Sequence, residues 1–233
     1  MPWAVGSPDI YPVQGREAAP FPSLALQRAG SSALAFGLLC ILVAFDATRA
    51  LDWWGASTAA PLSSPRLDLA SFLLSLVGEP HMTGTIALLL AIQGWRRHGG
   101  SGLTPLLLFI GVGLEVVLKY VLPHPGPPAL FARELHLPAF LHFSDSLMLH
   151  FPTPYSFPSG HMLRATFLVA LVSVHRPRWH AVGWLLILAM AFTRVYGNEH
   201  WLSDVVGGAL LGWGLAQLAL AGYKRGDAGP YGP

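Results

Sequence analysis

Apolar residues recur along the chain in long, nearly uninterrupted runs, and this pattern sets the expected fold. A helix crosses a hydrocarbon core of roughly 30 Å at about 1.5 Å per residue, so a span needs about 20 mostly apolar residues. Six runs of about this length occur, at residues 30–48, 80–96, 103–122, 159–175, 179–196 and 201–222. The sequence therefore predicts an all-α, polytopic membrane protein built as a six-transmembrane-helix bundle.

The segment between the first two runs has a different pattern. In residues 63–80, SSPRLDLASFLLSLVGEP, apolar residues recur at helical spacing over only about a dozen positions. That length is too short for a span and is typical of an interfacial or re-entrant helix.

The two ends of the chain lack such runs. Residues 1–28 are rich in proline and contain no apolar core of the signal-peptide type. We expect an N-terminal tail over residues 1–28, a membrane domain over 29–222 and a C-terminal tail over 223–233.

Basic residues mark one side of the predicted bundle. The connections and tails on that side carry Arg16, Arg28, Arg96, Arg97, Arg176, Arg178, Lys224 and Arg225, whereas basic and acidic residues are mixed on the other side. The positive-inside rule makes the basic side, with both tails, cytoplasmic. We expect a multi-pass protein of the cell membrane whose opposite face lies outside the cell or in the periplasm.

Composition agrees with a membrane protein. Hydrophobic residues make up 53% of the chain and charged residues 11%, and the mean hydropathy is +0.49. The formal net charge of +2, without a long basic run, gives no indication of nucleic-acid binding. Cys40 is the single cysteine and cannot form an internal disulfide.

Polar and ionisable residues gather at the span ends on the face opposite the basic loops. Such residues are costly at a bilayer boundary, so they are functional candidates. Alternation of the spans brings seven of them to one face: Lys119, Ser159, Gly160, His161, Arg194, His200 and Asp204.

Local spacing gives these residues a chemistry. His200 and Asp204 are four residues apart, so the carboxylate can accept the proton of one ring nitrogen and leave a lone pair on the other. Ser159 suits the start of the fourth span, where free backbone N–H groups can bind an anion. Lys119 and Arg194 add the fixed positive charge that a phosphoryl group requires.

Two stretches carry a family resemblance. PSGH at 158–161 and TRVYGNEHWLSD at 193–204 resemble the second and third signature motifs of the type 2 phosphatidic acid phosphatase superfamily. The first motif of that family, lysine, six residues, then arginine-proline, is half present, since Lys119 and Pro127 match but Gly126 stands at the arginine position. The resemblance extends over roughly residues 30–222.

The resemblance implies metal-independent hydrolysis of a phosphomonoester or diphosphate through a phosphohistidine, with no cofactor. His200 would attack phosphorus, Asp204 would orient and charge its ring, and His161 would protonate the leaving oxygen. The residues implied to bind the phosphoryl oxygens are Lys119, Ser159, Gly160 and Arg194.

Because Gly126 stands in place of the motif arginine, it is an open question which residue supplies the missing positive charge. One hypothesis is that Arg164, one turn beyond His161, or Arg133 in the outer loop replaces it. The alternative is that Glu115 neutralises Arg164. Glu115 also lies four residues before Lys119 on the third span, so these two side chains are expected to pair.

Several other polar and small residues have plainer interpretations. The outer-loop histidines match no metal-ligand spacing, so we interpret them as solvated side chains: His124, His136, His142 and His150. Gly208 and Gly212 permit close helix contact, which we expect within the bundle and not between two chains. The oligomeric state stays open.

The expected function is hydrolysis of a lipid phosphate monoester or a polyprenyl diphosphate at the extracytoplasmic face, with a membrane lipid as the substrate. Two alternatives remain. A lipid phosphotransferase would use the same intermediate, and a non-catalytic lipid-phosphate binder or transporter would fit the missing arginine.

Overall fold

Helices are the regular elements throughout the part of the chain that the computed structural model describes, residues 21–62, 64–132, 136 and 153–222. The all-α class is therefore confirmed. The α-helices are α1 Phe21–Ala44, α2 Arg49–Ala59, α3 Pro65–Gly78, α4 Pro80–His98, α5 Leu107–Val121, α6 Gly160–His175, α7 His180–Tyr196 and α8 Leu202–Gly222. Short 3-10 helices are η1 Gly99–Leu106, η2 Ala129–Phe131 and η4 Pro177–Trp179.

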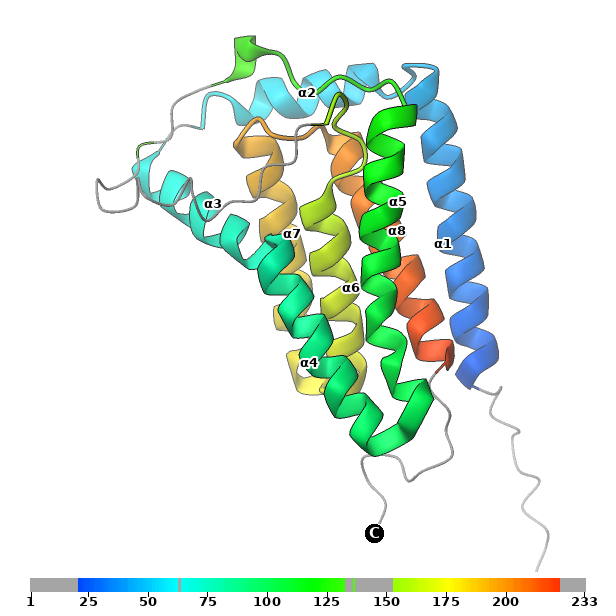
Figure 1. The fold of residues 1–233 in the computed structure, drawn as a ribbon. Helices are drawn as coiled ribbons and strands as arrows, with labels where there is room; N and C mark the ends of the chain where they lie inside the picture. Colours follow the sequence, from blue (N-terminus) through cyan, green and yellow to red (C-terminus); the bar gives the residue numbers. More distant parts are fainter. Residues whose placement is uncertain (1–20, 63, 133–135, 137–152, 223–233) are drawn as a thin grey trace, which may run out of the picture.

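A long helix forms at each of the six apolar runs, as α1, α4, α5, α6, α7 and α8 (Figure 1). By length and composition, four stretches could cross a membrane: Leu24–Ala44, Pro80–Val121, Pro177–Tyr196 and Leu202–Gly222. The second of these contains α4, η1 and α5, and Figure 1 shows that α4 runs down to η1 and α5 runs back up from it, so the two helices are antiparallel. The apolar part of α6, Gly160–Val174, is shorter.

The first helix differs from its predicted bounds. α1 begins at Phe21 and ends at Ala44, whereas the sequence predicted a helix over residues 30–48. Gln27 and Arg28 interrupt the apolar pattern, but both are good helix formers and can extend to water at the end of the bundle. Part of the predicted tail is therefore helical, while residues 1–20 and 223–233 lie outside the described residues.

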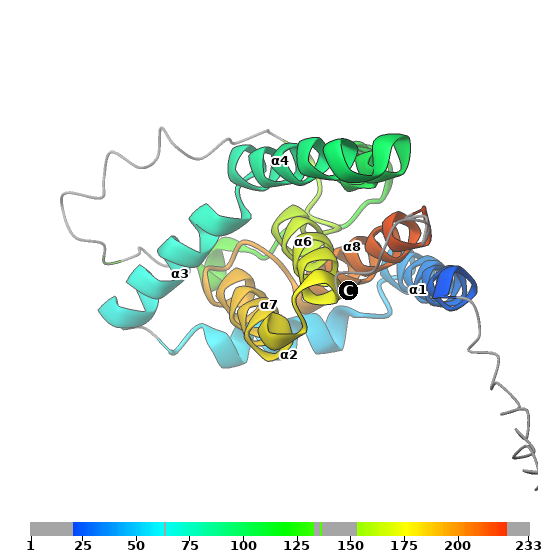
Figure 2. The same ribbon diagram turned by 90° about the horizontal axis from the view of Figure 1, so that it is seen from below.

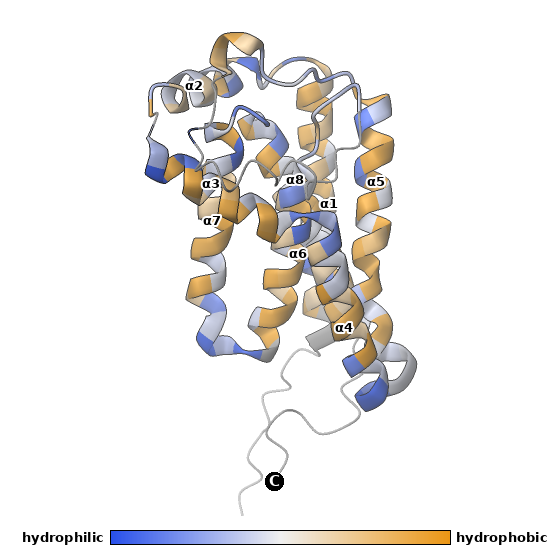
Figure 3. Cartoon of the chain, turned by 60° about the vertical axis from the view of Figure 1, so that its left-hand side comes forward, coloured by the Kyte–Doolittle hydropathy of each residue, from blue (hydrophilic) through white to orange (hydrophobic). Residues whose placement is uncertain are grey.

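α6 occupies the middle of the bundle. It contacts α3, α4, α5, α7 and α8, and Figure 2 shows it surrounded by α4, α7 and α8, with α1 packed on the outer side of α8. The core on α6 includes Leu163 and Phe167, both with no exposed surface. In contrast, Leu34 on α1 is 79% exposed and Leu188 on α7 is 65% exposed. Figure 3 shows apolar residues along the shafts of the long helices, as a bilayer requires.

Two glycines set the contact between α6 and α8. A Cβ on Gly208 would lie 2.2 Å from the carbonyl oxygen of Ser159, and one on Gly212 would lie 2.3 Å from that of Leu163. Any side chain at these positions would push the helices apart. The expectation that these glycines pack inside the bundle is confirmed, and the contact fixes the start of α6 beside the start of α8.

Two short helices lie at one end of the bundle. α3 matches the short helix expected in residues 63–80, whereas α2 was not predicted. α2 buries Asp52, Gly55, Ala56 and Ala59, which share one helical face. It packs on α7 and α8 with this face of small residues, which carries no long apolar run.

Candidate active site

The seven candidate residues lie on helix ends that meet at one end of the bundle. Lys119 is in the last turn of α5, Ser159, Gly160 and His161 are at the start of α6, Arg194 is in the last turn of α7, and Asp204 is in the first turn of α8. Figure 1 shows these ends together beneath α2. His200 precedes α8 and is not part of that helix, which begins at Leu202.

A tight turn between α7 and α8 brings Arg194 and His200 together. The backbone N–H of His200 donates to the carbonyl oxygen of Arg194 at 3.2 Å. Asn198, within this turn, has φ 56°, a left-handed conformation that asparagine tolerates better than most residues. The turn therefore places the imidazole beside the end of α7.

His200 and Asp204 form the expected pair. Nδ1 of His200 lies 3.1 Å from Oδ2 of Asp204, which also accepts the backbone N–H of Trp201 at 3.0 Å. Because Oδ2 of Asp204 already accepts the Trp201 N–H, it acts as an acceptor toward the ring as well, so the ring proton belongs on Nδ1 and the lone pair on Nε2. A ring held in this way can act as a nucleophile.

The start of α6 is attached to the same helix end. The backbone N–H of Ser159 donates to the carbonyl oxygen of Asp204 at 3.0 Å. The hydroxyl of Ser159 caps no backbone N–H of α6. Because the first turn of a helix has N–H groups without helical partners, this end offers donors to an anion next to His200.

Three buried donor-capable atoms from α6 and α7 have no hydrogen-bond partner among the described residues: Ser159 Oγ, His161 Nε2 and Arg194 Nε. Nε2 of His161 lies 3.4 Å from Oε1 of Glu79, a contact without hydrogen-bond geometry. Buried polar atoms are normally paired, so a group of unpaired donors at one site is suited to a polar ligand or to water. An oxyanion, which is rich in acceptors, is one group that can accept from all three.

Arg194 is the buried cation of this group. Its side chain is fully buried, Nη1 donates to Oε2 of Glu199 at 2.5 Å, and Nη2 donates to the hydroxyl of Ser75 on α3. These two partners fix the guanidinium plane and leave Nε available.

Glu115 forms ion pairs with the two other cations near the site. Lys119 Nζ lies 3.0 Å from Glu115 Oε1, as expected from their spacing, and Arg164 Nη1 lies 3.2 Å from Glu115 Oε2. Nε of Arg164 donates to the carbonyl oxygen of Gly78 at 2.9 Å. The structure thus favours the alternative in which Arg164 is neutralised, and Arg133 lies outside the described residues.

Gly160 leaves room for this carboxylate. A Cβ at Gly160 would lie 2.1 Å from Oε1 of Glu115, so any other residue would displace the carboxylate that holds Lys119. The glycine therefore links the Glu115–Lys119 pair of α5 to the α6 helix end.

His124 contradicts its interpretation as a solvated loop side chain. It is 6% exposed, and its Nε2 lies 3.2 Å from Ser203 Oγ and 3.5 Å from Asp204 Oδ1. His136, by contrast, has a 68% exposed side chain, with Nδ1 3.4 Å from Asp68 Oδ2. His142 and His150 lie outside the described residues.

Sequence reasoning also missed several carboxylate and hydroxyl groups that contact the candidate residues. Asp52 of α2 accepts both the backbone N–H and the hydroxyl proton of Ser203, at 2.8 Å each. The other contacts come from Ser75, Glu79 and Glu199. Asp52, Ser75 and Glu79 belong to no recognised motif, and Glu199 stands at a position that the third motif leaves unspecified, so the single sequence carried no signal for them.

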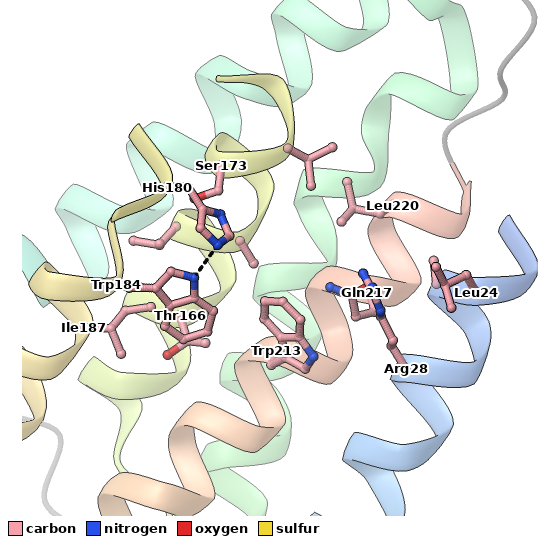
Figure 4. Close-up of a pocket in the computed structure, with 14 residues that line it drawn as sticks. Leu24, Arg28, Thr166, Ser173, His180, Trp184, Ile187, Trp213, Gln217 and Leu220 are labelled. Atoms are coloured by element: carbon pink, nitrogen blue, oxygen red, sulfur yellow. Dashed lines mark hydrogen bonds between the residues drawn. The ribbon is translucent and has the colours of Figure 1, made fainter. Parts of the chain in front are cut away.

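A separate cavity lies at the opposite end of the bundle. It has a volume of about 130 Å³ between α1, α6, α7 and α8, and Leu24, Arg28, His180, Trp184 and Gln217 are among the residues that line it (Figure 4). Trp184 Nε1 donates to His180 Nε2 at 2.9 Å in its wall. None of the seven candidate residues lines this cavity.

Comparisons with known proteins place the chain in a family. Residues 102–226 match the model of the PAP2 superfamily. An undecaprenyl-diphosphatase of Sulfolobus acidocaldarius is 29% identical over 150 residues, which cover 63% of this chain and 66% of that protein. The crystal structure of a transmembrane PAP2-type phosphatidylglycerolphosphate phosphatase from Bacillus subtilis matches with a TM-score of 0.65 and 20% identity, covering 82% of this chain and 94% of the other.

The structural likeness, at this identity, concerns the fold. The family match includes Lys119, the α6 start and the α7–α8 turn, all within residues 102–226. It therefore contains the part of the chain in which the two motifs were found, and the chain belongs to the PAP2 superfamily.

Proposed function

We propose that the chain is an integral-membrane lipid phosphatase that hydrolyses a lipid phosphate monoester or a polyprenyl diphosphate through a phosphohistidine at His200. The observation that carries this proposal is the oriented His200–Asp204 pair, at 3.1 Å, beside buried unpartnered donors from α6 and α7. The relatives named as an undecaprenyl-diphosphatase and a phosphatidylglycerolphosphate phosphatase support the same reaction class.

The first step transfers the phosphoryl group to the protein. The Nε2 lone pair of His200 forms a bond to phosphorus while the bond from phosphorus to the leaving oxygen breaks, and His161 gives that oxygen a proton. Asp204 accepts the Nδ1 proton in a hydrogen bond and stabilises the positive charge that the ring acquires.

The second step regenerates the imidazole. Water attacks the phosphohistidine, His161 takes the proton from that water, and the phosphorus–nitrogen bond breaks to release inorganic phosphate. Arg194, Lys119, the Ser159 hydroxyl and the Gly160 N–H stabilise the charge on the phosphoryl oxygens throughout. No step requires a metal.

The helix ends support an extracytoplasmic site and six spans. The candidate residues lie at one end of the bundle, and Arg28, Arg96, Arg97, Arg176 and Arg178 lie at the other. If α1, α4, α5, α6, α7 and α8 all cross the membrane, the positive-inside rule makes the second end cytoplasmic. The site then faces the outside or the periplasm.

An apolar groove supports a substrate with a hydrocarbon chain. It has a volume of about 270 Å³ and lies between α4 and α7 on the surface of α6, with Ile86, Leu168 and Val182 among its lining residues. Val77 and Thr83, at its α3–α4 end, flank Glu79, which contacts His161. A lipid in this groove would have its head group near the candidate site.

Phosphate release from a panel of lipids tests the proposal. The panel contains phosphatidic acid, phosphatidylglycerol phosphate and undecaprenyl diphosphate, with a chelator present and His200→Ala as the control. We expect release from at least one lipid, insensitive to the chelator and abolished in the variant. Chelator-sensitive release would contradict the metal-free mechanism, and phosphorylated acceptor lipid in place of free phosphate would indicate a phosphotransferase.

A non-catalytic lipid-phosphate binder remains the second candidate because Gly126 lacks the motif arginine and Glu115 engages both Lys119 and Arg164. That candidate predicts lipid binding that survives His200→Ala, with no phosphate release by the unmodified protein.

A further inference from the structure

Asp204 has one carboxylate oxygen that its pairing with His200 does not use. Oδ2 accepts from His200 and from the Trp201 N–H, whereas Oδ1 is buried and makes no hydrogen bond among the described residues. Nε2 of His124 lies 3.5 Å from Oδ1. A buried anionic oxygen requires a compensating positive or donor group, and this ring nitrogen is in place to provide it.

The surroundings of His124 fix its proton. The hydroxyl of Ser203 donates its single proton to Asp52 Oδ2 at 2.8 Å, so its oxygen can only accept from Nε2 of His124 at 3.2 Å. Asp52 Oδ2 itself lies 3.9 Å from Nε2. With acceptor oxygens on these sides, Nε2 must carry a proton, and the nitrogen that carries it lies 3.2 Å from Ser203 Oγ and 3.5 Å from the free oxygen of Asp204.

The ring and backbone of His124 are held from both sides. The centroid of the His124 ring lies 6.2 Å from the ring centroid of Phe157 and 6.5 Å from that of Trp201. Its carbonyl oxygen accepts the backbone N–H and the hydroxyl of Ser156, at 3.0 Å each. His124 thus connects the segment after α5 with the segment before α6 and with the start of α8.

We propose that His124 is a positioning residue, whose Nε2–H holds Asp204 in the rotamer that orients His200, and that Asp52 and Ser203 set His124 for this task. The inference rests on the proposed function in taking His200 as the nucleophile. A carboxylate held at both oxygens cannot turn about its Cβ–Cγ bond, so the Nδ1–H of His200 keeps one acceptor. Asp52 extends the arrangement to α2, outside the two family motifs.

Variants at position 124 distinguish the effect of the N–H donor from the effect of the space that the ring fills. His124→Gln can place an amide N–H where Nε2–H lies, whereas His124→Leu fills the space without a donor. His124→Asn is polar but too short to reach the same point, and it replaces the leucine variant if that one does not fold. His136→Gln removes an exposed histidine outside the site and is the matched control.

The first readout needs no substrate. Proton NMR of the protein in detergent micelles records the His200 Nδ1–H signal, assigned by its loss in His200→Gln. We expect the signal to persist in His124→Gln and His136→Gln, and to vanish by exchange with water in His124→Leu or His124→Asn. An unchanged signal in both donor-free variants would overturn the proposal.

The second readout is the kinetics of phosphate release. In His124→Leu we expect kcat to fall about 10- to 100-fold, the range found for outer partners that orient ligating histidines, with KM within about twofold. His124→Gln should recover most of kcat, and loss of activity in His124→Gln equal to that in His124→Leu would contradict the donor role. If the unmodified protein releases no phosphate from any lipid, the proposed function fails while the NMR result still decides the role of His124.

Discussion

The backbone N–H of Ser159 donates to the carbonyl oxygen of Asp204 at 3.0 Å. This bond joins the two stretches that carry the family motifs, although 45 positions of sequence separate them (204 minus 159). Gly208 and Gly212 of α8 then keep the first turns of α8 close to the first turns of α6. Asp204 and the start of α6 are therefore held together, which in the proposed function sets the orienting acid beside the anion-binding helix end.

Asp204→Asn tests the charge of the orienting acid. The amide preserves the shape of the side chain but removes the negative charge and can favour the wrong ring tautomer. We expect kcat to fall by about 10⁴, as in the corresponding change in a Ser-His-Asp triad. Phosphate release measures it, and Asp46→Asn, at an exposed ion pair with Arg49, is the control. Activity within about tenfold of the unmodified protein would contradict the assigned role.

Ser159→Ala separates binding from stability. The Ser159 hydroxyl is buried without a partner among the described residues, so its removal should leave the unfolding temperature unchanged or slightly higher, while KM for the lipid rises about tenfold. Ser156→Ala is the matched control because its hydroxyl donates to the His124 carbonyl at 3.0 Å. That variant should lose about 1 kcal/mol of stability. A clear fall in the unfolding temperature of Ser159→Ala, with KM unchanged, would show a structural role instead.

Gly126→Arg restores the arginine that the first motif lacks. A Cβ at this position would meet Ser156 Cβ at 3.7 Å, an ordinary contact, so the backbone can accept a side chain. An added charge-assisted hydrogen bond to phosphate is worth roughly 1.5–3 kcal/mol, so we expect KM to fall about tenfold or more. The steady-state kinetics of Gly126→Arg, compared with those of Gly126→Gln, give the answer. Equal KM values in the two variants would show that the new guanidinium does not reach the phosphate.

Narrowing the groove between α4 and α7 tests the path of the hydrocarbon chain. Ile86→Trp and Val182→Trp place bulk at exposed positions that line it. We expect KM for a long-chain lipid phosphate to rise several-fold, because about 0.8 kcal/mol is lost for each methylene group that can no longer be buried. A short-chain, water-soluble analogue should show unchanged kinetics in the same variants. Leu34→Trp on α1, away from the groove, is the control, and equal effects on both substrates would contradict this path.

Much of the fold follows from one-dimensional hydropathy. Each long apolar run forms a helix whose surface can face either the protein core or lipid. The helix therefore follows from the run itself, without reference to other segments. α2 was missed because its buried face consists of Gly55, Ala56, Ala59 and Asp52, a pattern that hydropathy does not distinguish from a loop. Its role depends on contacts with α7 and α8, which a local pattern cannot show.

The same distinction applies to the site. The pairing of Glu115 with Lys119 followed from a four-residue spacing, which fixes neighbours on a helix. The pairing of His200 with Asp204 was expected from the same spacing, but His200 lies before α8 and the turn after α7 places its ring beside Asp204. The contacts of Ser203 with Asp52 and His124 join residues 151 and 79 positions apart. Loop length and composition gave no reason to bury His124, whose place is explained by the packing of Phe157 and Trp201 around its ring together with its polar contacts to Ser203 and Asp204.

Arg194 binds Ser75 on α3, and Tyr196, two residues later, donates its hydroxyl proton to Asp68 of the same helix at 2.6 Å. α3 is too short to cross a bilayer and lies beside the bundle (Figure 1). A helix of this kind would lie among lipid head groups, so the cation at the centre of the site is anchored to a segment that senses the membrane surface. Under the proposed function, bilayer thickness and head-group packing would then become variables of catalysis in their own right.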